Sequence, residues 1–202
     1  MKRLRRVRAV TMPLDSDLLG TPGNIEGKRV FLSLGSNLGD RVANIRKALE
    51  QLTDVGVKIK RVSSYYKTEP VDFLPQAWFV NCVAEAETHL MPMQLLRAVK
   101  LVERALGRRT GVAKRPRAID IDILLYESVV VRSAALNIPH PHMAERRFVL
   151  LPLRELAGNL RHPITKRTVY EMLQETPDRS VAALYERRST NAEIFDSERR
   201  RS

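Results

Sequence analysis

Two aspartates in an isoleucine-rich stretch have the clearest potential for chemistry in this sequence. The stretch is Ala118–Tyr126, and it reads AIDIDILLY. Apolar residues alternate with Asp120 and Asp122, which is the period of two of a β-strand with one face on a core. Both carboxylates then point to the same side of a sheet, roughly 6.5–7 Å apart along the strand. Two carboxylates so placed repel each other unless a cation lies beside them, so the spacing predicts a metal site.

The segment before this strand is strongly basic. Residues 104–117 contain no acid and carry six positive charges: Arg104, Arg108, Arg109, Lys114, Arg115 and Arg117. Carboxylates that hold a hard metal, next to a basic segment, favour a polyphosphate held by both. An acidic pair can also be solvated surface only. Strands disfavour aspartate, however, so this alternative is the weaker one.

The composition limits the class of protein. A chain of 202 residues with 44% hydrophobic residues allows one domain of ordinary size plus tails. The single cysteine, Cys82, excludes an internal disulfide framework and fits a reducing compartment, so a cytoplasmic location is expected. No run of about 18 apolar residues occurs, so no membrane span is expected. The net charge of +12 indicates an anionic partner, such as a nucleotide, a nucleic acid or an acidic lipid.

Hydrophobic periodicity predicts the elements that position the aspartates. A helix is expected after Asp40 as N-cap and another from Pro92 to Gly107. The other expected elements are strands at 29–34, 58–66 and 79–87, a hairpin strand at 129–131 that follows the aspartate strand, and a last helix around 169–173. This order predicts an α+β fold with a ferredoxin-like βαββαβ core, an added β-hairpin strand and short C-terminal helices.

The domain is expected to span residues 29–175. Residues 1–28 are basic, are broken by glycine and proline and show no sustained period, so they predict a disordered arm. Residues 176–202 are polar and charged and are expected to form a solvated tail.

Two further groups of residues could bind a ligand. Phe79 and Asn81 share one face of the strand at 79–87, where a planar heterocycle could stack on the ring and hydrogen-bond to the amide. From position alone, an ordinary pair of sheet residues is the stronger interpretation. His140 and His142 lie in a proline-bounded loop, and a single imidazole that contacts phosphate is favoured there over a zinc site.

Five motifs occur in the order found in one known family. They are FLSLGSNLGDR at 31–41, SSYYKTEP at 63–70, FVNCV at 79–83, PRAIDIDILLY at 116–126 and IPHPHMAERRFVLLPL at 138–153. Through them, residues 29–175 resemble the 6-hydroxymethyl-7,8-dihydropterin pyrophosphokinases of folate biosynthesis. The resemblance implies transfer of diphosphate from ATP to the hydroxymethyl group of the pterin, with release of AMP and with two Mg²⁺ ions.

The resemblance also implies a role for individual residues. Asp120 and Asp122 would hold both Mg²⁺ ions, and Arg108 and Arg117 would bind the polyphosphate and stabilise its developing charge. The other ATP-binding residues implied are Glu103, a buried helix residue that supports the site, and Ile123, Asn137, His140 and Arg146. The implied pterin-binding residues are Thr68, Pro70, Val71, Phe79, Asn81 and Phe148, with the two phenylalanines on either side of the pterin. The chain departs from the family pattern at Glu69, Lys114, Arg115 and Pro141.

Two other functions compete with this one. A nucleotidyltransferase of the polymerase-β type also pairs a Gly-Ser turn with an acidic DxD strand, but Gly35-Ser36 here precedes Asp120 by several elements. A basic RNA-binding module on a ferredoxin-like sheet would use surface aromatics, whereas aromatic residues make up 5% of this chain. We therefore expect a monomer with two small-molecule substrates, ATP and the pterin, and without a membrane or nucleic-acid partner.

Overall fold

The computed structural model describes residues 27–70, 76–107 and 116–186. The elements of the sheet are β1 (Lys28–Ser36), β2 (Val57–Val62), β3 (Tyr65–Thr68), β4 (Phe79–Thr88), β5 (Asp120–Tyr126) and β8 (Ala182–Glu186). The helices are α1 (Arg41–Asp54), α2 (Pro92–Ala105), α3 (Arg147–Ala157) and α4 (Val169–Glu175). A second, two-stranded sheet consists of β6 (Val131–Arg132) and β7 (Asn137–Ile138).

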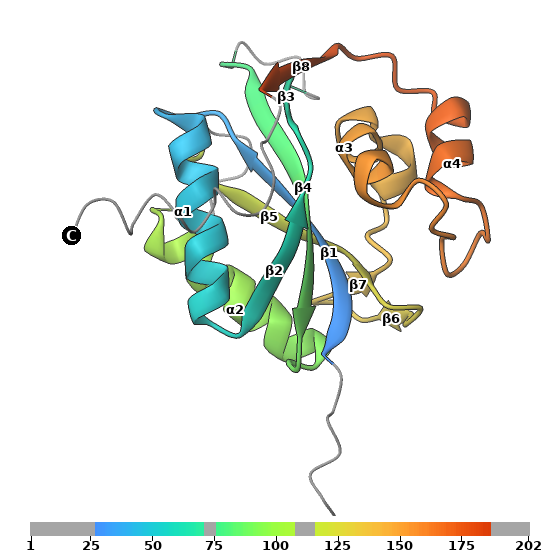
Figure 1. Ribbon diagram of the computed structural model, residues 1–202, viewed down its shortest axis with the longest axis horizontal. Helices are drawn as coiled ribbons and strands as arrows, with labels where there is room; N and C mark the ends of the chain where they lie inside the picture. The colour runs from blue at the N-terminus through green and yellow to red at the C-terminus, as the bar shows by residue number, and fades with distance from the viewer. Residues whose placement is uncertain (1–26, 71–75, 108–115, 187–202) are drawn as a thin grey trace, which may run out of the picture.

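The main sheet is antiparallel and lies between two layers of helices. Its order is β5-β1-β4-β3-β8, and β2 also pairs with β4. Helices α1 and α2 cover one face, whereas α3 and α4 lie on the other (Figure 1). The predicted α+β fold with a ferredoxin-like core is confirmed by this order, in which β1 and β4 are central.

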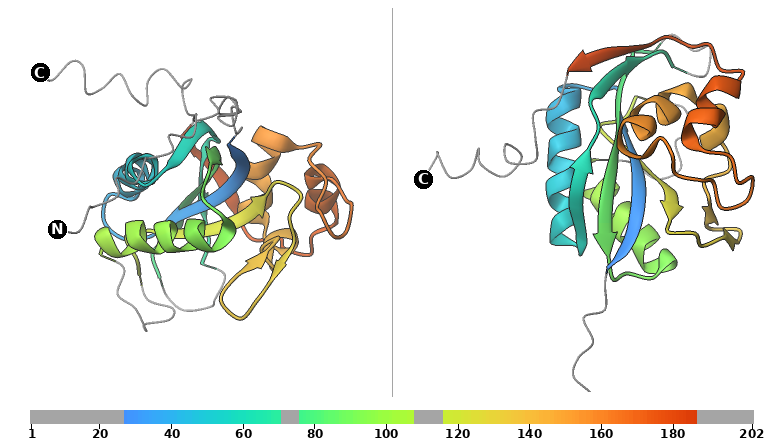
Figure 2. Two further views of the ribbon diagram at one scale, coloured as in Figure 1. Left: turned by 90° about the horizontal axis from the view of Figure 1, so that it is seen from below. Right: turned by 45° about the vertical axis from the view of Figure 1, so that its right-hand side comes forward.

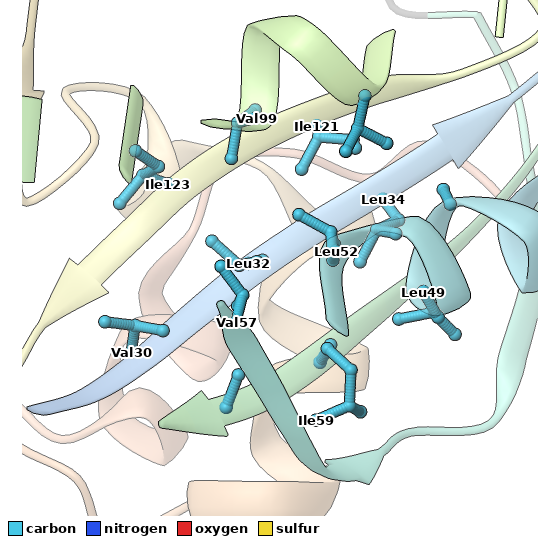
Figure 3. Packing of buried hydrophobic residues seen from close by; sticks show 14 of the residues in the cluster. Val30, Leu32, Leu34, Leu49, Leu52, Val57, Ile59, Val99, Ile121 and Ile123 are labelled. Atoms are coloured by element: carbon cyan, nitrogen blue, oxygen red, sulfur yellow. The ribbon is translucent and has the colours of Figure 1, made fainter. Parts of the chain in front are cut away.

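Alternation along β1 supplies a core to each face of the sheet. Val30, Leu32 and Leu34 are fully buried and pack with residues of α1 and α2 (Figure 3). Phe31 points the other way and packs with α3 and α4. Buried on both faces, β1 has little freedom to shift its register, because a slip of one residue would exchange the two faces.

The helix boundaries follow local sequence signals. The Asp40 side chain accepts a hydrogen bond from the Ala43 backbone amide at 3.0 Å, as expected for the N-cap of α1. Pro92 occupies the first turn of α2, and Gly107 follows its end with a φ of +90°.

Three elements differ from those predicted. The strand expected at 58–66 is interrupted at Ser63 and Ser64, and both of its parts, β2 and β3, pair with β4. At the break, Ser63 Oγ accepts the hydrogen bond of the Val83 amide at 3.0 Å. The prediction that a strand at 129–131 forms a hairpin with the aspartate strand is also wrong, because β6 pairs with β7 instead. Finally, the sheet extends beyond residue 175, because β8 pairs with β3.

The chain ends expected as an arm and a tail lie largely outside the described residues. Within the described residues, no helix is long and apolar enough to cross a membrane.

Candidate active site

A cavity of about 350 Å³ opens at the end of β1. It is lined by many of the predicted site residues: Thr68, Pro70, Phe79, Asn81, Arg117, Asp120, Asp122, His140, Arg146 and Phe148. Ser33, Gly35 and Gln76 line it as well and were not predicted, and so does Glu69, which lies between the predicted Thr68 and Pro70. The residues come from four strands, three loops and helix α3, so it is the fold that brings the sequence motifs together.

The two aspartates lie on one face of β5. Asp120 is paired in register with Gly35 of β1, and Asp122 with Ser33. Both line the cavity, whereas Ile121 is buried in the core behind the strand. The predicted geometry is therefore present, and the metal-binding role of the pair stays a prediction.

Arg117 lies between the acidic and the aromatic sides of the cavity. Its Nη1 is 2.9 Å from Asp120 Oδ2, and its guanidinium carbon lies 5.9 Å from the centre of the Phe79 ring. Its Nε is buried and has no hydrogen-bond acceptor among the described residues. An unsatisfied donor in a cavity favours an anionic ligand, because an oxygen of that ligand would restore the missing hydrogen bond.

Asn37, which was not predicted, holds the backbone of Arg117 although it does not itself line the cavity. It is 2% exposed, and its Oδ1 accepts a hydrogen bond from the Arg117 amide at 2.8 Å. Its Nδ2 donates to Gln76 Oε1 at 3.2 Å. Asn37 is therefore hydrogen-bonded to both Gln76 and Arg117, which lie far apart in the sequence. The only signal was its place in the Gly-Ser-Asn turn, which is also typical of an ordinary tight turn.

The opposite side of the cavity is aromatic and amide-lined. Asn81 is 4% exposed, and its Nδ2 donates to Thr68 Oγ1 at 2.6 Å. The amide lies so close to Gly35 that a Cβ at that position would collide with Asn81 Oδ1. Phe79 of β4 and Phe148 of α3 both line the cavity, so a planar ligand could contact both rings and the amide.

His140 is held as a neutral hydrogen-bond donor. Its Nδ1 accepts from the His142 amide at 3.2 Å, so the proton of the neutral ring is on Nε2. Burial, together with the positive charges of Arg146 and His142, lowers the pKa of His140 to about 4, although Asp120 opposes the shift. Near neutral pH the ring would donate a hydrogen bond to an anion without carrying a charge.

The titration of His140 gives a first testable prediction. In the metal-free protein, its ring signals in NMR should titrate near pH 4 and not near the ordinary value of 6.5. Between these two pKa values the folded state binds fewer protons than the unfolded state. The contribution of His140 should therefore lower the free energy of unfolding as the pH falls from about 6.5 to 4. His140→Gln should flatten the stability curve in this range. An unchanged curve, or a titration near 6.5, would contradict the assignment.

Some predicted residues do not line the cavity. Glu103 is 1% exposed and lies behind β5, where its Oε1 accepts from the Ile121 amide at 2.8 Å. It holds the aspartate strand from behind, and its role in supporting an ATP site stays a prediction. Ile123 is buried in the core and Asn137 is exposed on β7, so the structure does not place their side chains at the cavity. Arg108 and Val71 lie outside the described residues.

The donor set of the cavity suits magnesium bound together with phosphate. Among the described residues, no group of three or more histidine, cysteine or acidic side chains could hold a metal by itself. Mg²⁺ is usually bound by one or two carboxylates plus substrate phosphates, and it retains several waters. Asp120 and Asp122 are such a pair, so the residues present fit a metal that binds with its phosphate ligand.

Comparisons with known proteins connect the chain with one enzyme family. A model of the 7,8-dihydro-6-hydroxymethylpterin-pyrophosphokinase (HPPK) family matches residues 31–158. The 2-amino-4-hydroxy-6-hydroxymethyldihydropteridine pyrophosphokinase of Aquifex aeolicus is 41% identical over 146 residues, which cover 72% of this chain and 91% of that protein. The enzyme of the same name from Bacillus subtilis is 40% identical, with 67% of this chain and 81% of that protein covered.

Longer relatives contain the matched region as one part. The folic acid synthesis protein fol1 of Pneumocystis carinii is 36% identical over 175 residues, and the match covers 87% of this chain but 24% of that protein. Among solved structures, an HPPK-DHPS of Plasmodium falciparum aligns with a TM-score of 0.60 over 74% of this chain and 43% of that chain. Because the sequence identity is 16%, this structural match is evidence for the fold only. The resemblance seen in the motifs is thus confirmed: the chain belongs to the HPPK family of pterin pyrophosphokinases.

Proposed function

We propose that this chain transfers diphosphate from ATP to 6-hydroxymethyl-7,8-dihydropterin and releases AMP, as a step of folate biosynthesis. The observation that carries the proposal is the single cavity in which an acidic pair and an aromatic-amide pocket face each other across β1. Gly35 is paired with Asn81 on one side and with Asp120 on the other, so the two substrate sites would meet at one strand end.

The acidic side of the cavity is the proposed site of ATP. Asp120 and Asp122 would hold two Mg²⁺ ions, which would neutralise charge on the phosphates. Arg117 supplies donors to the polyphosphate, and the neutral His140 donates from Nε2. Arg146 lies with its guanidinium carbon 5.7 Å from the centre of the Phe148 ring, at the boundary between the phosphate and pterin sides.

The aromatic side is the proposed site of the pterin. The rings of Phe79 and Phe148 would stack on its two faces, and the Asn81 amide would hydrogen-bond to its edge. Because Thr68 Oγ1 accepts from Asn81 Nδ2, the orientation of the amide is fixed before the ligand binds. Such preorganisation favours one orientation of the heterocycle and directs its hydroxymethyl group toward the phosphates.

The transfer itself needs positioning and charge neutralisation more than proton transfer. Nδ1 of His140 is occupied by the His142 amide and Nε2 carries the proton, so we assign no general base to this ring. In a loose transition state the attacking hydroxyl loses its proton late. A pH–rate profile of the chemical step that required one base near neutrality would count against this mechanism.

The decisive test is a coupled assay of AMP formation with ATP, magnesium and hydroxymethyl-dihydropterin. AMP should form only when the pterin is present, together with the pterin diphosphate in equal amount. Release of pyrophosphate from ATP would instead support a nucleotidyltransferase. RNA binding that is sensitive to salt and survives Asp120→Ala would support the RNA-binding module.

The substitution Phe148→Ala tests the pterin side separately. We expect the KM for pterin to rise about tenfold, because one stacking surface is lost, while the KM for ATP changes little. Leu151→Ala, on the next turn of α3 and not in the cavity, is the matched control. Equal losses of pterin and ATP affinity in Phe148→Ala would contradict the proposed sandwich.

A cytoplasmic monomer without a nucleic-acid partner is part of the same proposal. The support is the single, buried cysteine and the small-molecule character of the cavity. Size-exclusion chromatography with light scattering at micromolar concentration should give one mass near 23.1 kDa.

A further inference from the structure

The C-terminal strap, residues 176–186, lies beyond the part of the chain that the family model matches, which ends at residue 158. From α4 the strap passes one end of α3 and joins the sheet as β8 beside β3 (Figures 1 and 2). The sequence predicted a solvated tail here, whereas the structure shows a segment hydrogen-bonded to two walls of the cavity.

The first wall is the N-terminal turn of α3, which carries Phe148. Asp178 Oδ2 accepts a hydrogen bond from the Arg147 amide at 2.7 Å, while Oδ1 accepts from the Ser180 amide at 2.8 Å. The N-cap residue of α3, Arg146, makes no side-chain capping hydrogen bond of its own. Asp178 therefore supplies from a distant segment the anionic cap that a helix start favours.

The charge of Asp178 is stabilised in this position. Burial of the carboxyl would raise its pKa, but hydrogen bonds from Ser180 and Arg147 outweigh that effect, and the pKa is lowered from the ordinary value. The carboxylate is thus ionised near neutral pH, as a cap for α3 requires.

The second wall is the end of β3, which carries Thr68, Glu69 and Pro70. The Glu69 amide donates to the Val181 carbonyl at 3.3 Å, and the Val181 amide donates to Glu69 Oε2 at 3.2 Å. Next to this pair, Thr68 is in register with Ala182 of β8. The strap thereby fixes the strand end from which Thr68 Oγ1 orients Asn81.

The other end of α3 has an anchor of its own. Glu155 accepts hydrogen bonds from the Ser64 amide at 2.8 Å and from the Tyr66 hydroxyl, so the C-terminal half of α3 is attached directly to β3. Asp178 attaches the opposite half of α3, next to Phe148. Loss of Asp178 would leave α3 held at Glu155 and freer to move at the cavity.

We propose that the C-terminal strap is a positioning element of the pterin pocket and that Asp178 is its principal positioning residue. The strap holds the Phe148 wall and the Thr68–Pro70 wall at a fixed separation and touches neither substrate. This inference rests on the proposed function, because the pocket walls are assigned there to the pterin. It predicts a selective effect on the pterin, since the aspartate pair lies on β5, at the opposite edge of the sheet from β8.

The test compares three variants by binding and by kinetics. Asp178→Ala removes the cap, and Asp178→Asn retains one acceptor oxygen for two amides. Thr168→Ala is the matched control, because Thr168 Oγ1 caps α4 through the Glu171 amide at 3.1 Å and α4 does not line the cavity. Each variant is measured for thermal stability, for Kd of a nonhydrolysable ATP analogue, and for Kd of the pterin in the presence of that analogue.

Asp178→Ala should bind the pterin about tenfold more weakly, since a small displacement of a pocket wall has a large effect on a stacked ligand. Asp178→Asn should be intermediate, Thr168→Ala should bind the pterin like the wild type, and the affinity for the ATP analogue should stay the same in all three. If Asp178→Ala binds the pterin with wild-type affinity, this inference is wrong, whereas the proposed function is unaffected. Equal weakening in Thr168→Ala, or equal loss of ATP-analogue affinity, shows a merely structural role and also overturns it. If the wild type binds no pterin and forms no AMP, the proposed function fails, and this inference fails with it.

Discussion

Replacement of Asp122 or Asp120 by alanine should lower the rate of AMP formation by at least about a thousandfold, because each removes one of the two β5 carboxylates that would hold the metal ions. Among the described residues, no group of three or more histidine, cysteine or acidic side chains could hold the metal instead. The KM for pterin should change little, since the aromatic pocket is untouched.

The fold should survive both substitutions. The carboxylates are partly exposed at the end of an otherwise buried strand, and their mutual repulsion disappears with either one. Asp120→Ala also breaks the partly exposed ion pair with Arg117, which is worth less than about 1 kcal/mol. Circular dichroism and thermal melts measure this directly. The control is Asp54→Ala at the exposed end of α1, which should be fully active. Full activity of either cavity variant would refute the metal assignment.

Arg117→Ala should lower kcat by about a hundredfold or more while the KM for ATP changes much less. The guanidinium contacts Asp120 and lies near Phe79, so it is close to both proposed substrate sites, and its buried Nε has no hydrogen-bond acceptor among the residues that the structure describes. A donor placed where charge develops acts mainly in the transition state. Arg117→Lys should recover only part of the rate, because an ammonium group lacks the forked donors of a guanidinium.

The neighbouring Arg104 provides a matched control for charge. It lies exposed in the last turn of α2, so Arg104→Ala removes one positive charge from the same basic segment without changing the cavity. Rapid-quench measurements of a single turnover separate the chemical step from product release. If Arg117→Ala raised the KM for ATP as much as it lowered kcat, Arg117 would also stabilise bound ATP in the ground state, which would contradict a role mainly in the transition state.

The parts of the site that could be predicted from the sequence are those with a strict hydrophobic alternation or with a motif shared with a known family. Asp120 and Asp122 alternate with isoleucine, and this pattern fixes their common face whatever else the fold does. The roles of Phe148 and Arg146, by contrast, came only from the family resemblance. Neither has a local pattern that would connect it to β5.

The features that were missed depend on pairing between distant segments. Strand β8, which reads AALYE, is short, mostly exposed and surrounded by polar and charged sequence, so only its pairing with the edge of β3 identifies it as a strand. Asn37 and Gln76 are single polar residues in loops, and a hydrogen bond between them cannot be read from spacing. The break at Ser63 likewise depends on the Val83 amide, which lies on another strand.

The register at Gly35 has a consequence for how closely the two reactants can be spaced. Its neighbours across the sheet are Asn81 on one side and Asp120 on the other, so two interstrand steps, roughly 10 Å in all, separate the amide strand from the aspartate strand. Backbone ladders set that span, and movements of the loops cannot stretch it. The sheet itself therefore sets the distance between the two proposed substrate sites.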